Sequence, residues 1–85
     1  MPAKTLSLAN KANKQLRKLP LKIHIKVVIA LKLLKQNPLA GIKLEGELMN
    51  NYKLRVGDYR IIYKFDSKAS RLEILKIEHR QGVYK

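Results

Sequence analysis

The N-terminal part of the chain contains two short hydrophobic patterns. Residues 4–8 alternate polar and apolar side chains, which is typical of a β-strand. Beyond them, apolar residues recur at helical spacing: Ala12, Leu16 and Leu19. Asn10 is a residue type that often caps a helix at its N-terminus. Pro20 ends or separates this predicted helix, because proline cannot continue a helix interior.

Residues 21–36 fit two patterns at once. Every second residue from 21 to 29 is apolar, as in a strand, while apolar residues also recur three and four positions apart, as on a helix face. A run of sixteen residues without glycine or proline is long for a strand and ordinary for a helix. We therefore predict a helix, which ends at Asn37 because the residue before Pro38 avoids the helical region.

The C-terminal half predicts a loop followed by three strands. Residues 37–50 form the loop, and strands are expected over residues 52–56, 59–65 and 72–78. The element order is thus β-α-α-β-β-β. The fold class predicted is α+β: one domain over residues 1–85, with an antiparallel sheet and two N-terminal helices packed on one of its faces.

A tight turn at Gly57-Asp58 fixes the pairing of the first two of these strands. It places Arg55 directly opposite Arg60, and alternation puts Lys53 on the same face. The apolar residues share the opposite face: Tyr52, Leu54, Val56, Tyr59, Ile61 and Tyr63. Like charges directly opposite one another cost stability, so a bound polyanion explains this patch better than folding does. The alternative is a solvated basic face on a basic protein.

The net charge points to the same kind of partner. Nineteen Lys and Arg residues against six Asp and Glu residues give +13, and all six acidic residues lie after position 44. Such an excess favours RNA, DNA, an anionic membrane or an acidic protein as partner. The longest apolar run, residues 27–31, is far shorter than the roughly 20 residues that span a bilayer. We expect a cytoplasmic protein without a membrane partner.

Several other chemistries find no support in the sequence. There is no cysteine, and the two histidines, His24 and His79, show no metal-ligand spacing. The four glycines are isolated, so no glycine-rich phosphate loop is present. We predict neither a metal site nor a cofactor.

The C-terminal residues 79–84, with the sequence HRQGVY, combine charge with an aromatic ring. Arg80 can stabilise a phosphate, and Tyr84 can stack on a base. A simpler interpretation is that Tyr84 packs at the end of the core and that His79 is an imidazole at its rim. Both interpretations stay open at this point.

Residues 52–63, with the sequence YKLRVGDYRIIY, resemble the central motif of the RelE/ParE toxin superfamily. Residues 79–84 resemble its C-terminal motif in the form found in RelE members. Residues 16–20 resemble the end of its first helix, and residues 37–46 resemble the loop after its second helix. The resemblance covers nearly the whole chain. The motifs at residues 52–63 and 79–84 are fairly specific when they occur together. The resemblance implies a compact sheet with two N-terminal helices, including a helix over residues 21–36, in the toxin of a type II toxin–antitoxin system.

The resemblance also implies an activity: cleavage of messenger RNA on the ribosome, in which the 2′-hydroxyl of the RNA attacks the adjacent phosphate. Lys53 matches the family's proposed general base, and Arg55 and Arg60 would bind the RNA and stabilise the phosphate. Arg80 matches an arginine proposed as acid or charge stabiliser; an arginine pKa above about 12 favours the second role. Tyr84 matches the tyrosine that stacks on the substrate base.

Alternatives remain within the same resemblance. Other branches use a glutamate and a histidine as base and acid, and Glu45 and His79 could play these parts here. A ParE-like inhibitor of DNA gyrase without nuclease activity and a non-catalytic RNA-binding protein are the competing functions. The partners implied are an acidic RelB-like antitoxin, the ribosome and mRNA.

Overall fold

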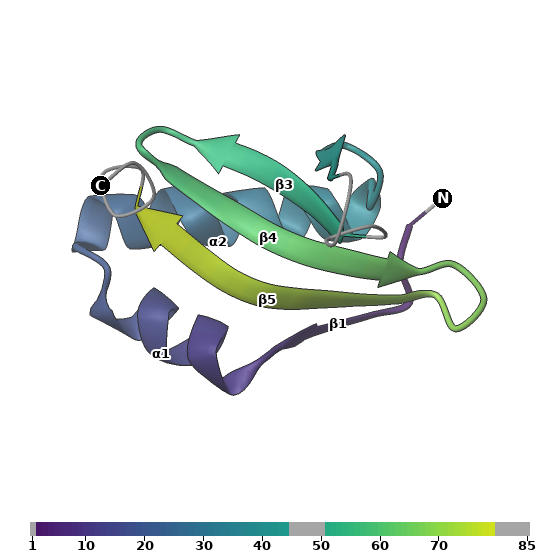
Figure 1. Ribbon diagram of the computed structural model, residues 1–85. Helices are drawn as coiled ribbons and strands as arrows, with labels where there is room; N and C mark the ends of the chain where they lie inside the picture. The colour runs from purple at the N-terminus through teal and green to yellow at the C-terminus, as the bar shows by residue number, and fades with distance from the viewer. Residues whose placement is uncertain (1, 45–50, 80–85) are drawn as a thin grey trace.

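The computed structural model describes residues 2–44 and 51–79, and Figure 1 shows the arrangement of their helices and strands. Glu45, Arg80 and Tyr84, which the sequence analysis selected, lie outside the described residues. The elements follow in the order β1 (Thr5–Leu8), α1 (Asn10–Lys18), α2 (Leu21–Gln36), β2 (Ile42–Lys43), β3 (Asn51–Val56), β4 (Tyr59–Asp66) and β5 (Arg71–His79).

The helices lie where the pattern predicts them. The predicted helix over residues 21–36 is confirmed as α2, with Asn37 directly after its last residue. Helix α1 already includes Asn10 as its first residue, while Ala9 occupies the cap position and no side chain caps the helix. The prediction that Asn10 is the cap is therefore wrong by one position, because Ala9 is the last extended residue and Asn10 is already helical.

The five strands form one sheet in the order β1-β5-β4-β3-β2. Strands β3, β4 and β5 form the predicted antiparallel meander, which confirms the α+β fold class. Strand β1 joins the outer edge of β5 in the parallel direction, so the whole sheet is mixed. Part of the predicted loop, Ile42–Lys43, pairs with β3 as the short strand β2.

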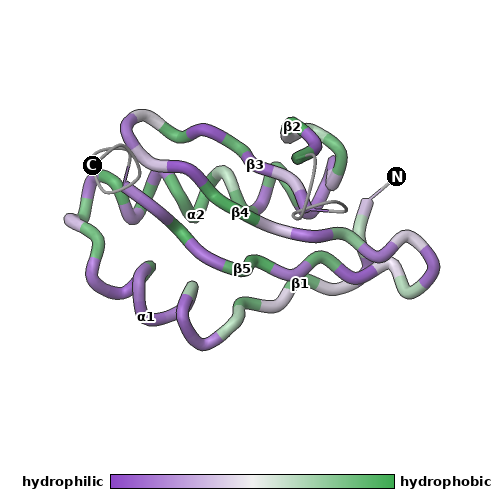
Figure 2. The backbone as a smooth tube through the Cα atoms, viewed as in Figure 1, coloured by the Kyte–Doolittle hydropathy of each residue, from purple (hydrophilic) through white to green (hydrophobic). Residues whose placement is uncertain are grey.

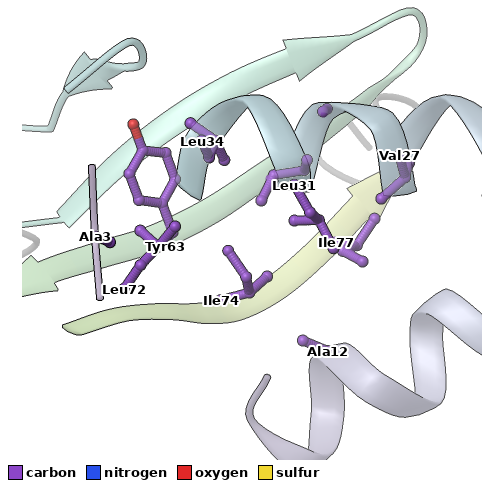
Figure 3. Packing of buried hydrophobic residues seen from close by; sticks show 11 residues of the cluster. Ala3, Ala12, Val27, Leu31, Leu34, Tyr63, Leu72, Ile74 and Ile77 are labelled. Carbon is purple, nitrogen blue, oxygen red and sulfur yellow. The ribbon is translucent and has the colours of Figure 1, made fainter. Parts of the chain in front are cut away.

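The hydrophobic core lies between the two helices and one face of the sheet. Helix α2 crosses behind the sheet and α1 lies beside β5 and β1 (Figure 1). The core residues of the helices are Ala12, Val27, Ala30, Leu31 and Leu34, and those of the sheet include Ile61, Tyr63, Leu72, Ile74 and Ile77. Figure 3 shows the side chains of α2 facing those of β4 and β5. The main core cluster thus lies on one face of the meander.

The buried hydroxyl of Tyr63 ties the segment after α2 to the sheet. It donates a hydrogen bond to the Pro38 carbonyl oxygen and accepts one from the Gly41 backbone N–H, both at 2.9 Å. Burial raises the pKa of Tyr63 above its usual value, although the Gly41 hydrogen bond opposes this shift. A Cβ atom at position 41 would lie 2.5 Å from the Lys53 carbonyl oxygen, so glycine permits this close approach to β3.

Helix α2 carries apolar residues on its exposed side as well as toward the core. Figure 2 shows the hydrophobic positions along the helix. Its exposed large apolar residues are Leu21 (74% exposed), Ile25 (50%), Ile29 (53%) and Leu33 (61%). They recur every four positions and so form one ridge along the helix. We call these four residues the α2 ridge. None of the helices in the described ranges is long and apolar enough to cross a membrane.

Candidate nucleic-acid interface

The face of the meander turned away from the core carries the predicted basic residues. Arg55 lies directly opposite Arg60 in the β3–β4 register, as the two-residue turn predicted. Lys53 lies two positions before Arg55 and therefore on the same face. Arg55 Nε lies 3.4 Å from the Gly57 carbonyl oxygen, to which it donates, so its side chain is directed toward the turn. The structure thus brings Lys53, Arg55 and Arg60 together.

Strand β5 adds two residues to this face, Lys76 and Glu78, which were not predicted from the sequence. Glu78 pairs with Arg60 and Lys76 with Ile62, whereas on the other side of an irregularity Tyr63 pairs with Ile74. Leu75 is the extra residue of this β-bulge. Because a one-residue shift exchanges the two faces of a strand, Lys76 and Glu78 point away from the core although Leu72 and Ile74 point toward it.

We call the five residues Lys53, Arg55, Arg60, Lys76 and Glu78 the basic face. Glu78 is its only acidic member and contacts two of its cations. Arg60 Nη2 lies 3.7 Å from Glu78 Oε2, and Lys76 Nζ lies 3.0 Å from Glu78 Oε1. Arg60 Nε is buried and makes no hydrogen bond with the described residues. Some of the donor capacity of the Arg60 guanidinium is therefore unused by this ion pair.

The floor of the basic face is apolar. Ile62 lies between Lys53 and Lys76 in the register and is only 2% exposed, yet it does not belong to the main core cluster. On the other side of Lys53, the register places the exposed side chain of Ile42. Charges above an apolar floor interact more strongly with a bound anion than charges in bulk water do. This arrangement can hold a phosphate and stabilise extra negative charge on it.

His79 lies on the opposite face of the sheet. It pairs with Tyr59, and the two rings meet edge to face with their centroids 4.8 Å apart. Tyr59 itself packs against the core. Among the described residues, His79 therefore stands at the rim of the core rather than beside Lys53. The other candidate residues, Glu45, Arg80 and Tyr84, lie outside the described residues.

Metal ligands do not gather in the described part of the chain. Residues 2–44 and 51–79 contain no group of three or more His, Cys, Asp or Glu side chains that could hold a metal ion. The basic face itself carries four cationic side chains, Lys53, Arg55, Arg60 and Lys76.

Comparison with known proteins identifies the family. The family model of the ParE toxin of type II toxin–antitoxin systems matches residues 6–84. Toxin RelG of Mycobacterium tuberculosis is 34% identical in an alignment of 83 residues that covers 95% of this chain and 95% of that toxin. The chain therefore belongs to the RelE/ParE superfamily, whose members are the toxins of type II toxin–antitoxin systems.

Solved structures share the whole arrangement. The toxin–antitoxin complex RelBE2 of M. tuberculosis contains a chain with a TM-score of 0.84 and 34% identity, and the match covers 94% of both chains. In the archaeal RelE–RelB complex of Pyrococcus horikoshii, the TM-score is 0.78 with 28% identity, over 89% of this chain and 93% of the other. The chain is thus a type II toxin of this superfamily, and both structures hold relatives together with an antitoxin.

Proposed function

We propose that this toxin is an endonuclease that cuts messenger RNA on the ribosome, and that the basic face is its active site. In this reaction the 2′-oxygen forms a bond to the adjacent phosphorus, and the bond from phosphorus to the 5′-oxygen breaks. A base takes the proton of the 2′-hydroxyl, cations stabilise the doubly charged phosphorane, and a proton is delivered to the leaving 5′-oxygen. The products are a cyclic phosphate and a free 5′-hydroxyl.

Each candidate residue has a role in this scheme. Lys53 takes the proton of the 2′-hydroxyl, and Arg55 and Arg60 bind the RNA and stabilise the charge that develops on the phosphate. Arg80 adds a further cation and Tyr84 stacks on the substrate base, as the C-terminal motif implies. Glu45 and His79 are the alternative base and acid. The rim position of His79, on the far face from Lys53, favours the first set of roles.

A single observation carries the proposal. Arg55 and Arg60 face one another directly on a strand pair whose other face makes the core, and Lys53 stands beside them over the buried Ile62. Directly opposed like charges reduce the stability of a sheet. A polyanion that binds to this face removes that cost, and RNA supplies both the charge and the reactive phosphate.

The proposed partners include an acidic, RelB-like antitoxin that silences the toxin. The M. tuberculosis and P. horikoshii relatives support this, because both were solved together with an antitoxin. Charge supports it as well, since the chain carries +13. The α2 ridge offers such a partner a place to bind: it is flanked by the exposed Lys22, Lys26 and Lys35, and α2 has no acidic residue. An amphipathic helix with acidic flanks matches this surface, whereas a second copy of α2 would set lysines against lysines.

The test compares ribosome-bound and free RNA. The purified toxin is added to translating ribosomes that carry a defined message, and to the same message alone. We expect fast cleavage on ribosomes and weak cleavage of free RNA, because the ribosome fixes the in-line geometry of the reacting groups. Such action places the toxin in the cytoplasm. Equal rates on both substrates contradict the proposed dependence on the ribosome.

A second function shares this fold. The family model that matches residues 6–84 is that of ParE toxins, which favours a gyrase inhibitor without nuclease activity as the alternative. A supercoiling assay with DNA gyrase, run beside the cleavage assay, separates the two. Intact RNA together with inhibited supercoiling establishes the alternative, and cleaved RNA with normal supercoiling establishes the nuclease.

A further inference from the structure

Glu78 is a carboxylate at the β5 side of a surface that otherwise attracts anions. It stands directly opposite Arg60, which in turn stands directly opposite Arg55, so the three residues form one row across β3, β4 and β5. The Glu78 side chain is 21% exposed, less than the 31% of Arg60 and the 37% of Lys76 that contact it. It is therefore the most enclosed member of its ion-pair network.

For binding alone, this carboxylate is unfavourable. A negative charge within an interface for a polyanion repels the ligand and lowers the local positive potential. Its effect is instead to orient the Arg60 guanidinium. Arg60 is repelled by Arg55 from one side and attracted by Glu78 from the other, which draws its guanidinium toward β5. The two oxygens of Glu78 contact different cations: Oε1 lies 3.0 Å from Lys76 Nζ and Oε2 lies 3.7 Å from Arg60 Nη2. Oε1 makes no hydrogen bond with the described residues, so both contacts are electrostatic attractions between charges.

We propose that Glu78 is a positioning residue: it holds the Arg60 guanidinium in the orientation in which it stabilises the phosphorane, and it does so at the expense of RNA affinity. This inference rests on the proposed RNA cleavage. Glu78 touches neither RNA nor the reacting atoms in this role, and it acts through Arg60. A guanidinium must point at the place where charge develops, because a stabilising donor works only at hydrogen-bond distance from the oxyanion.

The chain contains a matched control on the same side of the sheet, outside the five residues of the basic face. Glu73 also lies on β5 and pairs across the strands with Lys64, with Nζ 3.4 Å from Oε1. Its side chain is 34% exposed, and neither residue belongs to the basic face. Replacing Glu73 by glutamine removes the same charge and one ion pair without touching Arg60. Any effect specific to Glu78→Gln therefore reports on its two partners, Arg60 and Lys76.

The experiment measures binding, cleavage and melting temperature for the full-length toxin and its Glu78→Gln and Glu73→Gln variants. Binding is measured with a labelled RNA that carries a 2′-deoxy substitution at the cleavage position, and cleavage as a single-turnover rate on programmed ribosomes. We expect Glu78→Gln to bind RNA more tightly, by up to about fivefold, the size of one screened surface charge. We expect it to cleave at least about tenfold more slowly. Glu73→Gln gains affinity in the same way and cleaves within about twofold of the wild-type rate.

A double-mutant cycle then tests whether Glu78 acts through Arg60. In an Arg60→Ala background, Glu78→Gln should slow cleavage no further. An equal slowing in both backgrounds assigns Glu78 a role of its own, such as general base, and overturns the positioning role. Wild-type cleavage by Glu78→Gln overturns it too, as does a loss of cleavage that only parallels a lower melting temperature. A wild-type toxin that leaves ribosome-bound RNA intact overturns the proposed function itself, and the positioning role with it.

Discussion

The two faces of the β3–β4–β5 meander are built from the same strands but carry different kinds of side chain. On the helix-covered face, Ile61, Tyr63 and Ile74 are buried and join one core with both helices. On the basic face, cations oppose one another across the strands, and Glu78 is the one acid among them. Figure 2 shows the resulting alternation of hydrophobic and hydrophilic positions along the strands.

Under the proposed function, stability and activity depend on different faces of this molecule. Apolar burial on one face supplies the folding free energy. Exposed ion pairs and opposed cations on the other face contribute little to it, or reduce it. Substitutions on the covered face should therefore lower stability and activity together, and substitutions on the basic face should lower activity alone.

The largest expected effect lies on the covered face. Leu72 is fully buried in the core, so Leu72→Ala should lower the free energy of unfolding by about 2–5 kcal/mol through lost burial and the cavity left behind. Urea denaturation followed by circular dichroism measures this. Activity at a given temperature should fall only as far as the folded fraction falls. A slow Leu72→Ala variant that stays fully folded would contradict the separation of the two faces.

A smaller effect is expected at the Tyr63 hydroxyl. Tyr63→Phe leaves the Pro38 carbonyl and the Gly41 N–H without their partner, and should cost about 1–3 kcal/mol of unfolding free energy. Tyr52→Phe is the control, because Tyr52 stacks on Tyr63 without holding this segment. An equal loss of stability in both variants would show that the hydroxyl tether contributes nothing of its own.

The same hydroxyl predicts a dependence on pH. Burial favours the neutral phenol in the folded state, so the pKa of Tyr63 lies above 10.0 when folded and near 10.0 when unfolded. Its contribution to stability is therefore fully present below about pH 10 and is lost as the pH rises through the folded pKa. Denaturation series from pH 8 to pH 11 should show a steeper alkaline loss in the wild type than in Tyr63→Phe. Parallel curves for the two proteins would contradict this sign.

The smallest expected effect on the fold concerns the α2 ridge. Ile25 and Ile29 are about half exposed, so the double replacement by serine should change stability by less than about 1 kcal/mol. It should weaken binding of the cognate antitoxin by roughly tenfold or more, because two apolar anchors are lost. Titration of the toxin with purified antitoxin measures this. Unchanged affinity would show that the antitoxin binds to another surface of the toxin.

Much of the fold could be predicted from the sequence because the turn residues and the local hydrophobic pattern agree with the final arrangement of strands and helices. The Gly57-Asp58 turn fixed the register, and with it the opposition of Arg55 and Arg60. The position of β1 could not be read this way, because a parallel pairing with β5 is a contact between residues more than sixty positions apart. The short strand β2 escaped prediction since two residues carry no periodicity.

The candidate site was predicted only in part, and the bulge in β5 explains why. Simple alternation from Leu72 and Ile74 would turn Lys76 and Glu78 toward the core. The extra residue Leu75 reverses this, and the one signal in the sequence is the spacing of three between Ile74 and Ile77. Nothing in the sequence indicates that Glu78 contacts Arg60, because that contact depends on the register across β4 and β5.

Arg60→Ala tests whether the basic face performs RNA cleavage. The single-turnover rate on programmed ribosomes should fall by roughly 100-fold, through lost charge stabilisation. The free energy of unfolding should stay within about 1 kcal/mol, since the repulsion from Arg55 and the ion pair with Glu78 are lost together.

Lys11→Ala, an exposed site on α1, is the matched control and should cut within about twofold of the wild-type rate. We expect a slow and folded Arg60→Ala beside a fast Lys11→Ala. An Arg60→Ala variant that cuts at the wild-type rate, or that is slow only in proportion to its unfolded fraction, would show that the basic face is not the active site.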